Sequence, residues 1–194
     1  KEPAGFDYYS VFHDQGTYRD PVFKTAENWM DDDKGVGGAV EKGFSTDLVT
    51  DKAIRWIKER DRTKPFSVFC HFKATHEPCD FPERFAPLYD GVKFPEPENL
   101  LEFGPAKSGR TFAGQPLETM AWRWNKAYTD PENWWTYYPE LPFCGVEGDS
   151  VANRRAIYQK LVRDYLRCAA AIDDNIGRLL RTLDEEGLAE NTVV

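Results

Sequence analysis

The most informative segment of the chain reads PFSVFCHF at residues 65–72 and continues as KATHEP at residues 73–78. Its first part is a nearly continuous apolar run of strand length, a pattern typical of a strand that is covered on both faces. We therefore expect a central strand of a parallel sheet here. Because ligands bind beyond the carboxyl ends of the strands in such sheets, we expect the chemistry to lie in the segment that follows.

A helix is predicted directly before this strand, from Thr46 to about Arg60. The apolar residues of this stretch fall within half of a helical wheel, and Ser45 or Thr46 can cap the first turn. Residues 1–45 lack sustained periodicity and predict loops with one or two short strands. We therefore expect a loop-rich entry at residues 1–45, followed by a helix, a buried strand and a histidine turn at residues 46–76.

A second, longer helix is predicted from Ser150 to Glu186, and Gly187 is placed to end it with a left-handed cap. Its apolar residues fall within an arc of about 140° on a helical wheel. They are Ile157, Leu161, Tyr165, Cys168, Ile172, Ile176, Leu179, Leu180 and Leu183. Several charged residues lie outside that arc, namely Lys160, Arg163, Arg167, Asp174, Arg178 and Arg181. Residues 191–194 then look like the start of another buried strand.

The region between these elements, residues 77–149, is an excursion rich in proline and aromatic residues. It holds ten of the 13 prolines and four of the six tryptophans. Helical stretches are predicted near 82–89 and 117–126, and an aromatic cluster follows at residues 134–138. The order of helix, buried strand, excursion, long helix and buried strand predicts an α/β protein with a mostly parallel sheet flanked by helices.

Composition excludes several classes of partner. The 194 residues, 41% of them hydrophobic, suit part or all of one globular domain. The net charge of −8 has the wrong sign for a protein that binds nucleic acid or an anionic membrane. The four cysteines lack zinc-site spacing. Cys70 lies in an apolar run and Cys168 on the apolar side of a predicted helix, so we expect buried free thiols, with disulfides left open.

The segment KATHEP brings a cation, an imidazole and a carboxylate together. Lys73 can hold an anion, and His76 can transfer a proton near neutral pH. The alternative is a structural role, in which His76 is hydrogen-bonded within a turn before Pro78. We expect His71, within the strand, to be a core histidine and His13 to be a surface residue.

Three blocks of this sequence resemble the sulfatase family. Residues 64–78, continued by FPERFAPLY at residues 81–89, look like the family's buried strand that leads into an "APHxP" turn. The block AIDDNIGRLL at residues 171–180, followed by NTVV at residues 191–194, is similar to the family's long helix and the strand before its metal motif. The opening GFDYY at residues 5–9 resembles sulfatases that act on sulfated glycans.

The resemblance implies an alkaline-phosphatase-like α/β fold and a specific reaction. In the family, a hydrated formylglycine bound to calcium attacks the sulfur of a sulfate ester. The family's histidine at the position of His76 contacts the sulfate and protonates the leaving sugar oxygen, which makes His76 the catalytic candidate. Lys73 matches a position that is often lysine and is the candidate anion contact, while Thr75 replaces the more usual proline.

The sequence departs from the family in its nucleophile and metal motifs. Formylglycine forms from Cys/Ser-x-Pro/Ala-x-Arg, and no such motif is present. The segment CDFPER at residues 79–84 has one residue too many before the proline, so we reject Cys79 as the nucleophile. The family's metal-binding aspartates also lack counterparts. We therefore expect calcium ligands and formylglycine outside this chain, which resembles an internal fragment that is inert or nearly so by itself.

Further residues are candidates for contacts with a sulfated carbohydrate. Trp134 and Trp135, with Tyr137, suit stacking on sugar rings; the alternative is a local hydrophobic cluster. We expect Trp122 and Trp124 to be packing residues. Glu77 and Arg110 complete the candidate substrate contacts, although Arg110 suits a surface ion pair equally well.

Two other functions stay open from the sequence. One is a catalytically inactive sulfatase-like module that binds glycans through its aromatic loop. The other is a phosphodiester or phosphonate hydrolase of the same superfamily. The family resemblance is compatible with a periplasmic, secreted or lysosomal location, and the residues themselves select none of these.

Overall fold

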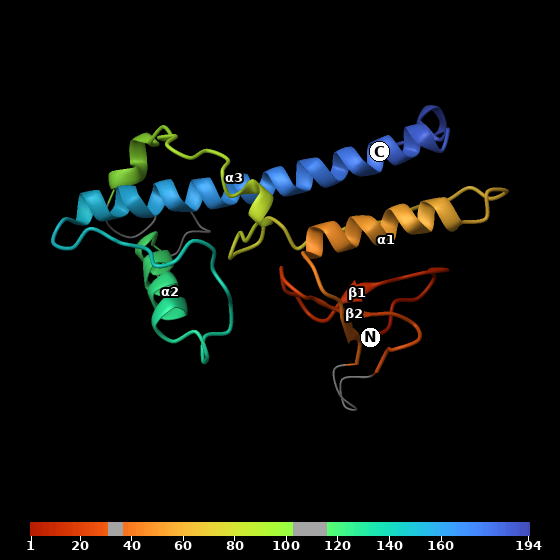
Figure 1. Ribbon diagram of the computed structural model, residues 1–194, viewed down its shortest axis with the longest axis horizontal. Helices are drawn as coiled ribbons and strands as arrows, with labels where there is room; N and C mark the ends of the chain where they lie inside the picture. The colour runs from red at the N-terminus through yellow and green to blue at the C-terminus, as the bar shows by residue number, and fades with distance from the viewer. Residues whose placement is uncertain (31–36, 103–115) are drawn as a thin grey trace. The chain divides into compact units, whose positions relative to one another are not determined.

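The computed structural model describes residues 1–30, 37–102 and 116–194. Their contacts divide the chain into two compact units. The first unit contains residues 1–75 and 169–194, and the second contains residues 76–168. Figure 1 shows the helices and strands of both units.

The first unit contains a small antiparallel sheet. Its strands are β1 (Val11–Phe12), β2 (Val22–Lys24) and β3 (Ala39–Val40), in the order β1-β2-β3. Phe23 on β2 is paired with Phe12 on one side and with Ala39 on the other, and only 1% of its surface is exposed. The sequence predicted one or two short strands in this region, and the structure has three.

The predicted first helix is present as α1, Ser45–Glu59. Phe44 is its N-cap, and no side chain caps the first turn, so the prediction that Ser45 or Thr46 caps this helix is wrong. The backbone N–H of Ser45 instead donates to the carbonyl oxygen of Tyr18 at 2.7 Å. A main-chain acceptor therefore takes the place of a side-chain cap.

The predicted long helix is α3, Ser150–Glu185. Gly187 adopts the left-handed conformation expected of its cap, with a φ of +69°. The N–H of Leu188 then donates to the carbonyl oxygen of Leu183 at 2.8 Å, which closes the end of the helix. A short 3₁₀ helix, η4 (Ala189–Asn191), follows.

The last part of α3 lies beside α1 in the first unit (Figure 1). Asn175 is fully buried, and its side-chain amide donates to Asp47 Oδ1 at 2.8 Å. Arg178 donates to Asn175 Oδ1 at 2.8 Å and forms an ion pair with Asp51 on α1. Polar contacts therefore join two helices that are far apart in sequence.

The strands expected at residues 65–72 and 191–194 are not formed. Neither segment belongs to a strand, and the described sheet is antiparallel rather than parallel. Phe69 is 68% exposed, Val193 is fully exposed, and His71 is an exposed residue rather than a core histidine. A buried parallel strand needs hydrogen-bonding neighbours, and none of the described strands pairs with either segment.

The second unit is built around α2, Glu118–Thr129. Both helical regions predicted in the excursion are present, because η2 (Glu83–Phe85) lies within 82–89 and α2 matches 117–126. A further 3₁₀ helix, η3, spans Glu98–Leu101. The core consists of buried residues from α2, α3 and the loop between them, namely Trp124, Ala127, Tyr138 and Ile157.

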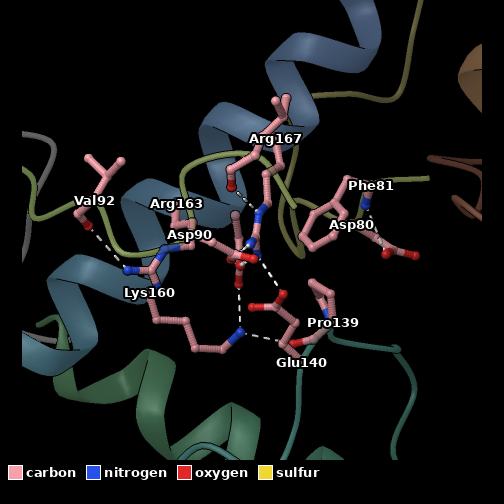
Figure 2. Close-up of polar contacts among 11 residues, drawn as sticks. Asp80, Phe81, Asp90, Val92, Pro139, Glu140, Lys160, Arg163 and Arg167 are labelled. Atoms are coloured by element: carbon pink, nitrogen blue, oxygen red, sulfur yellow. Dashed lines mark hydrogen bonds and ion pairs between the residues drawn. The ribbon is translucent and has the colours of Figure 1, made fainter. Parts of the chain in front are cut away.

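Charged residues lie on the buried side of α3 in this unit (Figure 2). Lys160 and Arg167 fall outside the apolar arc of the helical wheel, yet they are only 7% and 1% exposed. Lys160 pairs with Asp164 at 2.7 Å, and Arg167 pairs with Asp90 at 2.8 Å and with Glu140 at 2.5 Å. A helical wheel sorts residues by polarity, so it misses charged residues that are buried with their partners.

Burial dominates the electrostatics of Asp164 in this cluster. Burial raises its pKa to about 6, even though the ion pair with Lys160 and the nearby Arg167 lower it. Its Oδ2 accepts the hydrogen bond from Lys160, and its Oδ1 lies 3.9 Å from the Arg167 guanidinium. Burial of Asp164 therefore favours the neutral form of its carboxyl group over the charged form.

Candidate active site

The turn that begins at His76 opens the second unit. The backbone N–H of Cys79 donates to the carbonyl oxygen of His76 at 3.0 Å, and the His76 side chain is exposed. His76 Nδ1 lies 2.6 Å from the carbonyl oxygen of Glu77. Because a carbonyl oxygen can only accept, Nδ1 carries the hydrogen of this bond. Nε2 is then the nitrogen that can gain and lose a proton.

The Glu77 carboxylate is held by two side chains. Arg123 on α2 forms an ion pair with Glu77 Oε2, and the hydroxyl of Tyr138 donates to Glu77 Oε1. Burial, followed by this hydrogen bond, raises the pKa of Tyr138 well above its usual range, so the hydroxyl remains a donor. The hydrogen bond to Glu77 likewise raises the pKa of Arg123. Both carboxylate oxygens of the candidate substrate contact therefore have partners within the chain.

The residues that follow Glu77 are buried, including Cys79, which is 6% exposed. Burial raises the pKa of the Cys79 thiol to about 12. A nucleophilic cysteine needs the opposite change, because the thiolate is the reactive form. Burial of Cys79 therefore disfavours a thiolate at this position. None of the four cysteines, all of which lie in the described residues, takes part in a disulfide within the chain. Cys168 is buried as expected, whereas Cys70 is only partly buried.

Lys73, the candidate anion contact, belongs to the first unit, whereas His76 belongs to the second. Its Nζ donates to the carbonyl oxygen of Gln15 at 3.3 Å and lies 5.4 Å from the centre of the Tyr18 ring. Burial lowers the pKa of Lys73, and the Asp14 carboxylate opposes this change. The contact with Gln15 anchors the ammonium group to the loop after β1.

The predicted aromatic cluster is present beside α2. The Trp134 ring lies 5.5 Å from the Trp122 ring in an edge-on contact and 5.8 Å from the tilted Trp135 ring. Trp124 is fully buried, which confirms its predicted packing role. Trp122 is 54% exposed, so it packs against Trp134 at the surface and not in the core. Trp122 lies two positions from the buried Trp124, and residues two positions apart point to different sides of a helix, so Trp122 lies on the outer side of α2.

The cluster borders a hollow of about 590 Å³. Trp135, 71% exposed, and Tyr137, 56% exposed, present ring surface there. The other lining residues are Ala127, Tyr128, Pro131, Trp134, Thr136, Tyr138, Glu140 and Leu141. Tyr138 thus lines the hollow, and its hydroxyl donates to the carboxylate of Glu77, the residue next to His76.

Arg110 lies outside the described residues. Within the described ranges, no three His, Cys, Asp or Glu side chains come together in a way that could hold a metal ion. None of the described helices has the length and apolar character needed to cross a membrane.

Sequence reasoning missed Arg123 and the role of Tyr138. These residues lie 46 and 61 positions from Glu77, so no local motif connects them to the histidine turn. Only the proline-bounded aromatic cluster drew attention to Tyr138. Arg123 carries no signal beyond its place on a predicted helix.

The family model described as Sulfatase matches residues 3–194. The chain belongs to the sulfatase family. This match confirms the family indicated by the histidine turn and the long helix. Together with the helices and small sheet described above, it also confirms the α/β fold class of a partial sulfatase domain.

Two relatives extend this result. The chain is 33% identical over 223 aligned positions to N-acetylglucosamine-6-O-sulfatase of Bacteroides thetaiotaomicron, covering 100% of this chain and 38% of that protein. It also matches the structure of BT4656 in complex with its substrate D-glucosamine-2-N,6-O-disulfate, with a TM-score of 0.74 and 30% identity. That match covers 99% of this chain and 43% of the other. The chain therefore spans less than half the length of either relative.

Proposed function

We propose that the complete protein to which this chain belongs hydrolyses a sulfate ester on a carbohydrate. The observation that carries the proposal is the exposed His76, whose Nδ1 donates to the Glu77 carbonyl so that Nε2 is the proton-exchanging atom. The sulfatase match over residues 3–194, a range that includes the histidine turn, supports the proposal. When the ester S–O bond breaks, Nε2–H of the protonated ring passes its proton to the leaving sugar oxygen.

The other candidate residues are assigned to binding. Lys73 supplies a cation for the sulfate, and Trp134 and Trp135 supply ring surface for neighbouring sugars. Arg110 is proposed as a second anion contact. Calcium and formylglycine would supply charge neutralisation and the nucleophile, and we place both in parts of the complete protein outside residues 1–194.

The names of the relatives suggest the first substrates to test. One is named for 6-O-desulfation of N-acetylglucosamine, and the other was solved with a glucosamine that carries 2-N and 6-O sulfates. We propose a 6-O-sulfated glucosamine as the substrate class. A direct assay of sulfate release from differently sulfated glucosamines tests the position of the sulfate.

Sulfate release from N-acetylglucosamine-6-sulfate by the complete protein tests the proposal. Ion chromatography should detect sulfate, and His76→Ala should lower kcat about 100-fold or more. His13→Ala is the matched control, because it removes an exposed histidine from a loop of the first unit. Binding of sulfated glycans without release of sulfate would favour a catalytically inactive glycan-binding module. Hydrolysis of phosphodiesters or phosphonates alone would favour a phosphodiester or phosphonate hydrolase of the same superfamily.

A further inference from the structure

Glu77 links the histidine turn to the core of the second unit. Its two carboxylate oxygens are held separately, by Arg123 from α2 and by Tyr138 from the loop that follows α2. Its backbone carbonyl receives the hydrogen bond from His76 Nδ1. Glu77 therefore supplies the main-chain acceptor for the His76 imidazole, and its own side chain is held in place by Arg123 and Tyr138.

The two partners of Glu77 are themselves held in place by the core. Tyr138 is 1% exposed and belongs to the same buried cluster as Trp124, the residue that follows Arg123 on α2. Arg123 and Glu77 are only 24% and 29% exposed at their side chains. An exposed ion pair between mobile side chains contributes little to stability. The Glu77 carboxylate is held by a buried hydroxyl and by a guanidinium on a helix, so it loses most of its conformational freedom.

We propose that Glu77, Arg123 and Tyr138 are positioning residues that orient His76 for proton transfer to the leaving oxygen. This inference rests on the proposed function and gives Glu77 a different role from direct contact with substrate. A general acid must hold its proton within hydrogen-bond reach of the leaving atom, and small displacements reduce the rate strongly. The Arg123 ion pair also balances a negative charge that would otherwise stand beside an anionic substrate.

A double-mutant cycle in the complete protein separates this role from a structural one. Tyr138→Phe removes only the hydroxyl and should lower kcat for the sulfated sugar about 10-fold, with KM changed less than about twofold. In a His76→Ala background the same substitution should change kcat less than about twofold, because the residue acts through the imidazole. Glu77→Gln should show the same loss and the same dependence on His76.

Two matched controls come from the second unit. Tyr158→Phe removes a hydroxyl that donates to the Pro95 carbonyl at 2.8 Å, and Glu96→Gln breaks an ion pair with Arg155 at 2.9 Å. Neither contact involves the histidine turn, so kcat should stay within about twofold of the unmodified protein. Melting temperatures of all variants show whether a loss of activity follows a loss of folding.

The outcomes distinguish the inference from the function on which it rests. Equal losses for Tyr138→Phe with and without His76, or losses no larger than those of the controls, would overturn the positioning role while leaving the sulfatase function intact. Failure of the unmodified protein to release sulfate from any sulfated sugar would overturn the proposed function and this inference with it.

Discussion

The side-chain amide of Asn175 on α3 donates to Asp47 Oδ1 on α1 at 2.8 Å, across 128 positions of sequence. The same amide donates to the carbonyl oxygen of Ala171, and its oxygen accepts from Arg178. All the polar atoms of a fully buried side chain are therefore satisfied where the two helices meet.

Asn175→Ala should lower the free energy of unfolding by about 2–3 kcal/mol, because it removes three hydrogen bonds and leaves the Asp47 carboxylate without this donor. Urea denaturation of the complete protein measures the change. Asn133→Ala, which removes an exposed amide, should shift the free energy by less than about 0.5 kcal/mol. Equal effects of the two substitutions would show that the buried contact contributes nothing.

The free energy of unfolding should depend on pH because of the raised pKa of Asp164. Burial raises its pKa from 3.8 to about 6, so between these values the folded state keeps a proton that the unfolded state has released. Its contribution to stability is therefore complete below about pH 4 and is lost as the pH rises through 6. This rise in the pKa of Asp164 corresponds to about 3 kcal/mol in the free energy of unfolding.

Asp164→Asn tests this prediction, because the amide does not titrate. Subtracting the variant's free energy of unfolding from that of the unmodified protein should give a difference that falls by up to about 3 kcal/mol from pH 4 to pH 7. Asp173→Asn, at an exposed position of the same helix, is the control. A difference that stays constant with pH would contradict the assignment.

The four thiols should differ sharply in reactivity. A pKa raised from 9.0 to about 12 lowers the thiolate fraction of Cys79 about a thousandfold near neutral pH. Iodoacetamide should therefore modify the exposed Cys144 first, and Cys79 and Cys168 should react only after denaturation. Peptide mass spectrometry identifies the modified sites. Rapid labelling of Cys79 in the folded protein would instead place an accessible thiol beside the histidine turn.

The sequence predicted the elements well where a local pattern determines them. The long helix and its glycine cap follow from a repeat of apolar residues and one conformational preference, and both are present. The side of α3 that is buried was harder to predict. Lys160 and Arg167 are buried because Asp164, Glu140 and main-chain carbonyls pair with them, and such partners are invisible to a helical wheel.

The apolar run at residues 65–72 shows a second feature of the fold that the sequence alone does not determine. A continuous apolar pattern predicts that a strand is covered on both faces, but it does not identify the neighbouring strands. None of the described strands pairs with this run, and the chain spans 38% of the length of its relative. The contacts of Glu77 with Arg123 and Tyr138 were unpredictable for a related reason, since only the fold brings these residues together.

Trp135 should contribute to binding of sugars beyond the one that carries the sulfate. Its ring is 71% exposed at the hollow, so it is available for stacking. Trp135→Ala should raise KM for a sulfated oligosaccharide about 5-fold to 30-fold, which corresponds to about 1–2 kcal/mol. KM for the sulfated monosaccharide should change little. Tyr165→Ala is the control, because Tyr165 is an exposed aromatic residue of α3 that does not line the hollow. Equal effects of Trp135→Ala on both substrates would place Trp135 at the reacting sugar, and no effect on either would make the aromatic cluster a packing feature only.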